Sequence, residues 1–498
     1  MKRLPTFSIL VILFLIIGLG YFVFIKFKKN RANKKDDLNR VQSIAVLPLI
    51  NLNKDSSQTY FSDGFTEDIL NSLSQSKNVN ISARFSSFKF AGSEINAADI
   101  GKRLNVQDIL TGSYQLQGEK INLTTTLINT QTGSTIWSAK YVESFDNIFS
   151  LQNKVVNDVE EKLNIVLGDT DQVNIKKPTN NIDAYKLYLK GRASWNLRTP
   201  KELINSIDFF KQAITLDTSY AAAYAGIADC YNALGYGNFL SPKDAFPKAF
   251  EAATKALQLD TTLAEPHASL GFYNFYYQWD WAAAEQQFRA AISLNPNYAQ
   301  AYDWYGYYLT GMQRFEEAKI MFAKAAMLDP LSAPIVNDMG FSLYYKGDYD
   351  SAIKILERAL QLNPKYALAF IWKGRSYQAE KKYNEAINAF NQGIHFSPGL
   401  PILIAQIGNV YGVSGNEAGA QSTLDTLMSF YQKKYISAYM IALVYVGLRK
   451  NDLAFEWLNK GYEEKTNWMV WLKGDPRWAP LYPDKRYKEL MNKVGLPQ

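Results

Sequence analysis

The side chains most often used for catalysis and metal binding are scarce in this sequence. It holds two histidines, His267 and His395, and a single cysteine, Cys230. One thiol forms no disulfide within the chain, and a zinc site needs several Cys or His ligands close together. We find no Gly-x-x-x-x-Gly-Lys loop, no Gly-x-Ser-x-Gly elbow and no His-Glu-x-x-His pair. We therefore predict no catalytic residues, no metal ligands and no cofactor, and a protein that is not an enzyme.

Two acidic residues are the exception worth weighing. Asp63 lies in the segment Tyr60-Phe61-Ser62-Asp63-Gly64, and Glu67 follows Asp63 by four positions. Paired carboxylates can divide acid and base roles between them. A structural interpretation is favoured, in which both acids lie near the start of a helix and interact with its positive end.

Charge and aromatic content narrow the class of partner. The first 35 residues hold eight Lys and Arg and no acid, which leaves a net charge of about −1 for the rest of the 498-residue chain. A nucleic-acid-binding protein concentrates basic charge on its folded body, so we expect no nucleic-acid partner.

Aromatic residues make up 14% of the chain, which predicts repeated aromatic positions or an aromatic-lined surface.

Residues 7–25 form an uncharged run of 19 residues. As a helix this run is about 28 Å long, close to the ~30 Å hydrocarbon core of a bilayer. A cleaved signal peptide is the alternative, but the run ends in the bulky Tyr21-Phe22-Val23-Phe24-Ile25 rather than in small residues. We predict a short tail (1–6), a transmembrane helix (7–25) and a basic juxtamembrane linker (26–41). The positive-inside rule then places the body in the cytoplasm, with the periplasm as the alternative.

Residues 42–167 read as a small α/β domain. Strands are predicted at 43–49, 79–81, 108–117, 120–129 and 135–141, where apolar runs or alternation are bounded by turn residues. Helices are predicted at 62–74, 95–104 and 148–166 from apolar residues at helical spacing. This order indicates one mixed sheet covered by helices.

At these residues the sequence resembles a known family. The segments SIAVLPLINLNKDSSQTYFSDGFTEDIL, ARFSSFKFAG and IGKRLNVQDILTGSYQLQGEKINLTTTLINTQTGSTIWSAKYVESFDNIFSLQ look like the TolB-like amino-terminal domain, over residues 43–165. The resemblance implies a domain without a catalytic role, placed between an amino-terminal output module and a repeat array. That module is often a winged-helix DNA-binding domain or a nucleotide cyclase. Only about six residues precede the predicted anchor, so a direct role in transcription or cyclic-nucleotide synthesis is not expected. In relatives with a DNA-binding module the region after the membrane is periplasmic, which is why the periplasm stays open.

After a polar linker (168–183), residue types recur at a spacing of 34 positions. The glycine series is Gly306, Gly340, Gly374 and Gly408, with Ala442 at the next step. The parallel series are Ala318, Ala352, Ala386, Ala420 and Ala454; Phe322, Leu356, Phe390, Leu424 and Leu458; and Pro296, Pro330, Pro364 and Pro398. Small residues fit where two helices cross closely, and proline follows a helix that it cannot continue.

This pattern strongly resembles the tetratricopeptide repeat (TPR). The resemblance implies a mainly α fold, a TPR α-solenoid superhelix of about eight units over 184–468. A carboxyl-terminal capping segment (469–498) would follow, with a helix at 484–494 covering the exposed end.

In TPR arrays the first helix of each unit lines a concave groove, and the resemblance maps groove positions onto this chain. The predicted partner-binding residues are Phe272, Phe275, Tyr276, Asp303, Tyr307, Asn337, Phe341, Tyr344, Tyr345 and Arg375. Aromatic residues suit a binding surface because they bury much area while losing few rotamers. Arg375 could hold a carboxylate through paired hydrogen bonds. The alternative is that these aromatic residues pack against neighbouring helices or the first domain.

Three functions remain in view. The first is a membrane-tethered scaffold whose groove binds a peptide or protein partner, with no small-molecule substrate. The second is a regulatory or sensory subunit that signals to a separate output protein, such as a transcription regulator or nucleotide cyclase. The third is an enzyme with an unrecognised site in the first domain.

Overall fold

A computed structural model describes residues 42–53, 59–76, 79–93, 95–163 and 177–496 of the protein. The predicted tail, transmembrane helix and basic linker lie outside these ranges, as does most of the linker predicted at 168–183. Within the described ranges the protein has no helix with both the length and the apolar character needed to cross a bilayer. Residues 43–498 form one compact unit.

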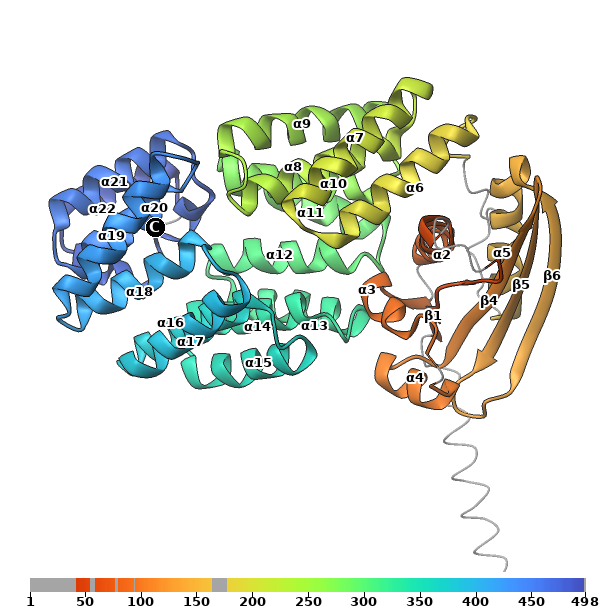
Figure 1. Ribbon diagram of the computed structural model, residues 1–498, viewed down its shortest axis with the longest axis horizontal. Helices are drawn as coiled ribbons and strands as arrows, with labels where there is room; N and C mark the ends of the chain where they lie inside the picture. Colours follow the sequence, from red (N-terminus) through yellow and green to blue (C-terminus); the bar gives the residue numbers. More distant parts are fainter. Residues whose placement is uncertain (1–41, 54–58, 77–78, 94, 164–176, 497–498) are drawn as a thin grey trace, which may run out of the picture. The chain divides into compact units, whose positions relative to one another are not determined.

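A mixed sheet lies near the start of this unit (Figure 1). Its strands are β1 (Gln42–Val46), β2 (Ile50–Asn51), β3 (Val79–Ser82), β4 (Asp108–Gln117), β5 (Lys120–Asn129) and β6 (Thr135–Ser144). The order is β3-β1-β4-β5-β6, with β2 also paired to β4. β1 runs parallel to β4, whereas β4, β5 and β6 are successively antiparallel. The predicted mixed sheet is confirmed, and Gly118 and Gly133 adopt positive φ in the two hairpin turns.

Helices cover the sheet on both faces. α2 (Thr59–Ser74) and α5 (Ile148–Lys162) bury apolar residues in one core with β1, β4 and β5. α4 (Ala97–Leu104) packs in a second, smaller core with Ala45 and Ile109 on the other face. Two short helices, α3 (Arg84–Ser87) and η2 (Phe88–Phe90), were not predicted from the sequence.

The helical array follows as hairpins (Figure 1). Its helices are α6 (Ile182–Leu197), α7 (Pro200–Leu216), α8 (Ala221–Tyr236), α9 (Pro242–Leu259), α10 (Ala264–Tyr273), η4 (Asn274–Gln278), α11 (Trp281–Leu294), α12 (Ala299–Gly311), α13 (Phe315–Leu328), α14 (Ala333–Lys346), α15 (Tyr349–Leu362), α16 (Ala367–Ala379), α17 (Tyr383–Phe396), α18 (Pro401–Val413), α19 (Glu417–Tyr431), α20 (Ala438–Gly447) and α21 (Asn451–Glu463). The helical repeat predicted from the 34-residue spacing is confirmed.

The repeated small residues lie where the helices of a hairpin touch. A Cβ added to Gly306 would come within 2.7 Å of the Phe322 ring, and one added to Gly340 would come within 2.7 Å of Leu356. The step from Gly271 to Ala284 is one residue longer than the equivalent step from Gly306 to Ala318 in the next repeat. Within this longer step, α10 continues into a π-helix at Asn274–Gln278. A π-helical turn absorbs a single inserted residue without breaking the helix.

The last described residues form η5 (Asn467–Trp471), η6 (Pro476–Leu481) and α22 (Lys485–Val494). α22 packs against α21 and buries Tyr487, Leu490 and Val494. The segment 467–481 packs against the inner helices of the array, so its placement differs from that of a cap that only covers the last hairpin.

The sheet region is fixed to the array by buried polar contacts. Asn297, in the turn before α12, donates from Nδ2 to the carbonyl oxygens of Ser74, Ser76 and Val79 at 2.9–3.0 Å. Its Oδ1 accepts from the Ile81 backbone N–H at 3.1 Å. One asparagine side chain thus satisfies the backbone around the end of α2 and the start of β3.

Candidate functional site

The ten residues predicted to bind a partner all lie on the first helices of their hairpins, but none is freely exposed. They occupy α10 with its π-helical extension, α12, α14 and α16, and every one of them is buried. The expectation of an open aromatic groove at these positions is therefore corrected. Whether a partner contacts any of them stays a prediction.

The physical reason is that the chain's own carboxyl-terminal segment covers most of them. The indole of Trp471 contacts five predicted residues, with ring-centroid distances between 4.8 and 6.3 Å. These five are Phe275, Tyr276, Tyr307, Phe341 and Tyr345. An indole buries a large apolar area and packs well edge-on against other rings, so this side chain fills the aromatic half of the inner surface.

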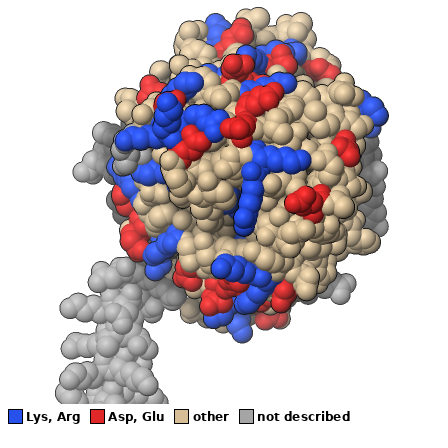
Figure 2. Space-filling model, turned by 90° about the vertical axis from the view of Figure 1, so that its left-hand side faces the viewer, with Lys and Arg blue, Asp and Glu red and all other residues tan. Residues whose placement is uncertain are grey.

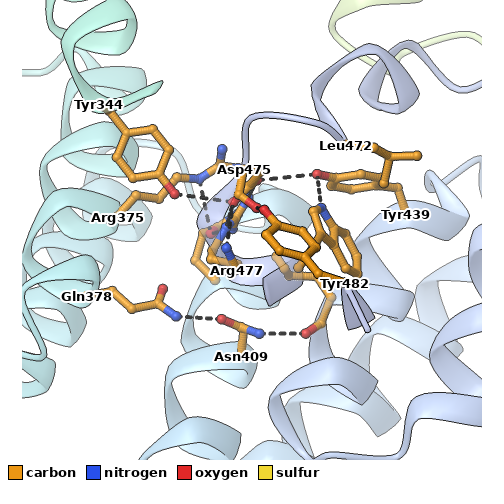
Figure 3. A network of polar contacts seen from close by, with 12 residues as sticks. Tyr344, Arg375, Gln378, Asn409, Tyr439, Leu472, Asp475, Arg477 and Tyr482 are labelled. Atoms are coloured by element: carbon orange, nitrogen blue, oxygen red, sulfur yellow. Dashed lines mark hydrogen bonds and ion pairs between the residues drawn. The ribbon is translucent and has the colours of Figure 1, made fainter. Parts of the chain in front are cut away.

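A buried polar cluster follows Trp471 and holds the segment in place (Figure 3). The Asp475 carboxylate accepts hydrogen bonds from the hydroxyls of Tyr344 and Tyr439, each at 3.3 Å, and forms an ion pair with Arg477. Burial alone would raise the pKa of Asp475, but Arg477 outweighs it and holds that pKa below its ordinary value. Asp475 also caps η6 by accepting from the Arg477 backbone N–H. A charged pair hydrogen-bonded in this way fixes register as well as position.

Surface charge at this end of the molecule is mixed. Figure 2 shows Lys and Arg interspersed with Asp and Glu over the face formed by the carboxyl-terminal helices, with uncharged areas between them. A surface of this kind produces no strong field of one sign.

A second part of the inner surface is polar and reachable by solvent. We define the inner polar surface by Arg198, Glu265, Tyr298, Gln300 and Tyr366, all of which are exposed or half-buried. Nη2 of Arg198 donates to Oε1 of Gln300 at 3.3 Å. Neighbouring protein atoms lower the pKa of Arg198 to about 10 and raise that of Glu265 by desolvation.

Arg198 is oriented by an unusual backbone and an aromatic neighbour. It adopts φ +56° just after α6, and its guanidinium lies 3.3 Å from the centroid of the Trp195 ring. Among the described residues Arg198 forms no ion pair. A guanidinium stacked on an indole keeps its N–H donors directed outward, which suits it to bind a carboxylate or a peptide carbonyl.

One predicted residue, Asp303, forms a buried acidic pair with Asp338, and another, Asn337, donates a hydrogen bond to that pair. Asp338 accepts from the Tyr307 hydroxyl at 2.6 Å and from Nδ2 of Asn337 at 2.7 Å. Burial raises the pKa of Asp338 to about 7, and burial together with Asp338 raises the pKa of Asp303. The two carboxyl groups are therefore coupled, since the charge on one disfavours ionisation of the other.

The sequence did not reveal the role of Glu67. Instead of lying at a helix end, its side chain is buried in the middle of α2, so the helix-dipole interpretation is corrected for this residue. Its carboxylate pairs with Arg84 Nε at 2.9 Å and accepts from Arg192 Nε at 3.1 Å. Asn196 adds a third donor at 3.2 Å. The sequence feature that could have revealed this site is an acidic residue in α2 together with two possible donors, Arg192 and Asn196, that lie one turn apart in α6.

Comparison with known proteins supports the repeat assignment. Residues 299–330 and 343–407 match families described as tetratricopeptide repeat. The chain therefore contains tetratricopeptide repeats, a fold that typically serves as a non-catalytic interaction scaffold.

Several named proteins share part of the sequence. The chain is 26% identical to "Putative adenylate cyclase 3" of Rhizobium meliloti over 46% of its length, and 25% identical to the transcriptional regulator HilA of Salmonella typhimurium over 66%. It spans 39% and 59% of those two proteins. Human tetratricopeptide repeat protein 6 is 26% identical over 40% of this chain and 36% of that protein.

Solved structures resemble parts of the array. A tetratricopeptide repeat protein from Parabacteroides merdae is 16% identical, covers 51% of this chain and 93% of its own, and has a TM-score of 0.37. PilW, a type IV pilus biogenesis factor, is 19% identical, covers 44% of this chain and 98% of its own, and has a TM-score of 0.35.

Proposed function

We propose that this protein is a membrane-tethered scaffold whose array binds a peptide or protein partner at the inner polar surface. The observation that carries the proposal is the difference between the two parts of the array's interior. The aromatic part is filled by the segment 467–481, whereas Arg198 is exposed and Glu265, Tyr298, Gln300 and Tyr366 are half-buried.

The chemistry of this surface fits a polypeptide ligand. Arg198 offers donors to backbone carbonyls or to an acidic side chain, and Glu265 offers an acceptor. Tyr298 and Tyr366 add apolar area with a polar edge, a combination enriched where proteins bind each other.

Membrane tethering is part of the same proposal. The uncharged run at residues 7–25 would be the anchor, and residues 42–167 would form a TolB-like domain beside it. The charge rule favours a cytoplasmic body. A reporter enzyme that is active on only one side of the membrane, fused after Gln498, distinguishes this from a periplasmic body.

Photo-crosslinking tests the binding surface. A photoreactive residue at position 298 or 366 of the full chain, in native membranes, is expected to capture the same partner at both positions. Ile320 on α13 is 61% exposed and serves as the control position on an outer helix. The change Arg198→Met should reduce capture at 298. Capture at 320 with none at 298 and 366 contradicts the proposed surface.

A regulatory subunit is the second candidate function. Its support is that two proteins sharing part of this sequence are named as a nucleotide cyclase and a transcriptional regulator. In that case the partner captured from position 298 would be an output protein of one of these kinds. Its DNA-binding or cyclase activity would change when this chain carries Arg198→Met.

A further inference from the structure

Arg375 is a buried cation whose two terminal nitrogens have no hydrogen-bond partner among the described residues. The residue lies on α16 and is 1% exposed. Its Nε donates to Oε1 of Gln406 at 3.2 Å, and its guanidinium stacks 4.2 Å from the centroid of Trp372. Nη1 and Nη2 form no hydrogen bond within the described chain. Because a buried charged donor without a partner is unfavourable, this position calls for a ligand.

The nearby carboxylate does not fill that need. Asp475 is paired with Arg477, which donates from its backbone, from Nε at 2.8 Å and from Nη2. The hydroxyls of Tyr344 and Tyr439 also donate to Asp475. The buried cluster formed by Arg375, Asp475 and Arg477 thus holds two guanidinium groups and one carboxylate, an excess of one positive charge. Burial and the neighbouring Arg477 both lower the pKa of Arg375, which agrees with this excess.

The other unsatisfied atoms around Arg375 are also donors. The Trp468 indole lies with its ring centroid 5.4 Å from the Arg375 guanidinium, and its Nε1 has no partner in the described chain. The ring of Tyr345 lies with its centroid 5.9 Å from that of Trp372, the same indole on which Arg375 stacks, and the Tyr345 hydroxyl is likewise without a partner in the described chain. The local acceptor Oε1 of Gln406 is already shared between Arg375 and Arg477. What is missing is an acceptor, and the charge excess favours a negative one.

We propose that Arg375, Tyr345 and Trp468 form a binding site for a small inorganic monoanion of the halide class. The near-complete burial of Arg375 sets the size limit, because a partner's carboxylate could reach it only if the segment 467–481 moved away. The anion would contact α14 and α16 through Tyr345 and Arg375, and the carboxyl-terminal segment through Trp468. It would therefore stabilise the packing of that segment against the array.

Thermal unfolding of the full chain in detergent tests the site. The midpoint Tm should be about 2 °C or more higher in 0.3 M sodium chloride or bromide than in sodium gluconate of equal ionic strength. Arg375→Met should abolish this difference, and Trp468→Phe, which keeps an aromatic ring but lacks the N–H, should reduce it. The control Arg358→Met, at an exposed position on α15, should leave it unchanged.

Crystals of the full chain grown in bromide give a direct readout. An anomalous bromide peak within hydrogen-bond distance of the Arg375 terminal nitrogens supports the proposal. Water alone at that position, equal Tm values in the two salts, or a halide shift that survives Arg375→Met would each overturn it. If Arg375→Met fails to fold, Trp468→Phe and the bromide peak decide the matter.

Discussion

At the scale of single residues, Trp471 and Asp475 cover the inner side chains of the array, through contacts such as those with Phe341 and Tyr344. The 34-residue spacing assigned Tyr307, Phe341 and Arg375 to the first helices of their hairpins, because the repeat itself defines which side each position faces. Their burial depends on Trp471 and Asp475, which belong to no repeat. A periodic pattern carries no information about a non-periodic segment that packs against it.

One residue-scale prediction concerns pH. Asp338 has a pKa raised to about 7 in the folded protein and an ordinary value of 3.8 when unfolded. Its stabilising contribution is therefore present below about pH 4 and is lost as pH rises through 7. Asp338→Asn keeps an oxygen to accept from Tyr307 but cannot ionise. The free energy of unfolding of this variant minus that of the wild type should increase by about 1 kcal/mol or more from pH 5 to pH 8, measured by urea denaturation.

The matched control for this prediction is Asp350→Asn, at an exposed position on α15. Its difference from the wild type should stay constant across the same pH range. If the Asp338→Asn curve runs parallel to the wild-type curve, the acidic pair does not titrate as proposed.

At the scale of elements, prediction succeeded where the local pattern is strong. The bounds of β4 and β5 agree with those expected from alternation and from a glycine turn. α3 and η2 were missed because their four and three residues carry no period. Their conformation depends on contacts with the array, including the hydrogen bonds from the Ala83 backbone N–H to the Leu328 carbonyl and from Lys89 Nζ to the Leu331 carbonyl.

The glycine series gives an element-scale prediction. In Gly306→Ala the new Cβ would lie 2.7 Å from the Phe322 ring, so α12 and α13 must separate or Phe322 must move. We expect a loss of about 1–3 kcal/mol in the free energy of unfolding, measured by urea denaturation. Phe322→Leu in the same chain should recover part of the loss, because Leu356 occupies the equivalent position one repeat later. An unchanged or more stable Gly306→Ala protein would show that close approach is not what selects glycine here.

At the scale of the whole molecule, sequence reasoning separated the sheet region from the array too sharply. Buried hydrogen bonds and ion pairs join them, from Glu67 with Arg192 to Asn297 with the end of α2. Such pairings connect residues more than 100 positions apart, and the sequence around one partner does not indicate the other. Domain-by-domain interpretation has no access to them.

A double-mutant cycle tests this connection. Glu67→Gln removes the carboxylate closest to Arg84 and Arg192, which keep only the longer ion pairs with Asp63 and Asp229, and should cost about 3 kcal/mol in the free energy of unfolding. Arg192→Met should cost less, because Arg84 still pairs with Glu67. The double variant should be less destabilised than the sum of the two single variants. Glu161→Gln, in an exposed pair with Lys162, is the control and should change little. Strict additivity would mean that the pair does not couple α2 to α6.

The carboxyl-terminal segment provides a further prediction at this scale. A protease site inserted after Glu463, which is exposed at the end of α21, allows the segment to be cut from the array after folding. Each buried side chain such as Trp471, Trp478 or Leu481 contributes about 1.5–3 kcal/mol. We expect the cut fragment to coelute with the array on size exclusion and to leave only in denaturant. A fragment that elutes alone in native buffer would instead identify a displaceable segment and an aromatic surface open to partners.

The position of Trp471 near the end of the chain also bears on how the protein is made. Translation proceeds from the amino terminus, so the ribosome completes α10, α12, α14 and α16 well before it reaches residue 471. Until then their aromatic side chains lack the indole that covers them, and a nascent chain with exposed apolar surface is prone to aggregation and to chaperone binding. Termination a few dozen codons early would leave that surface uncovered for good, which makes truncated products candidates for rapid proteolysis.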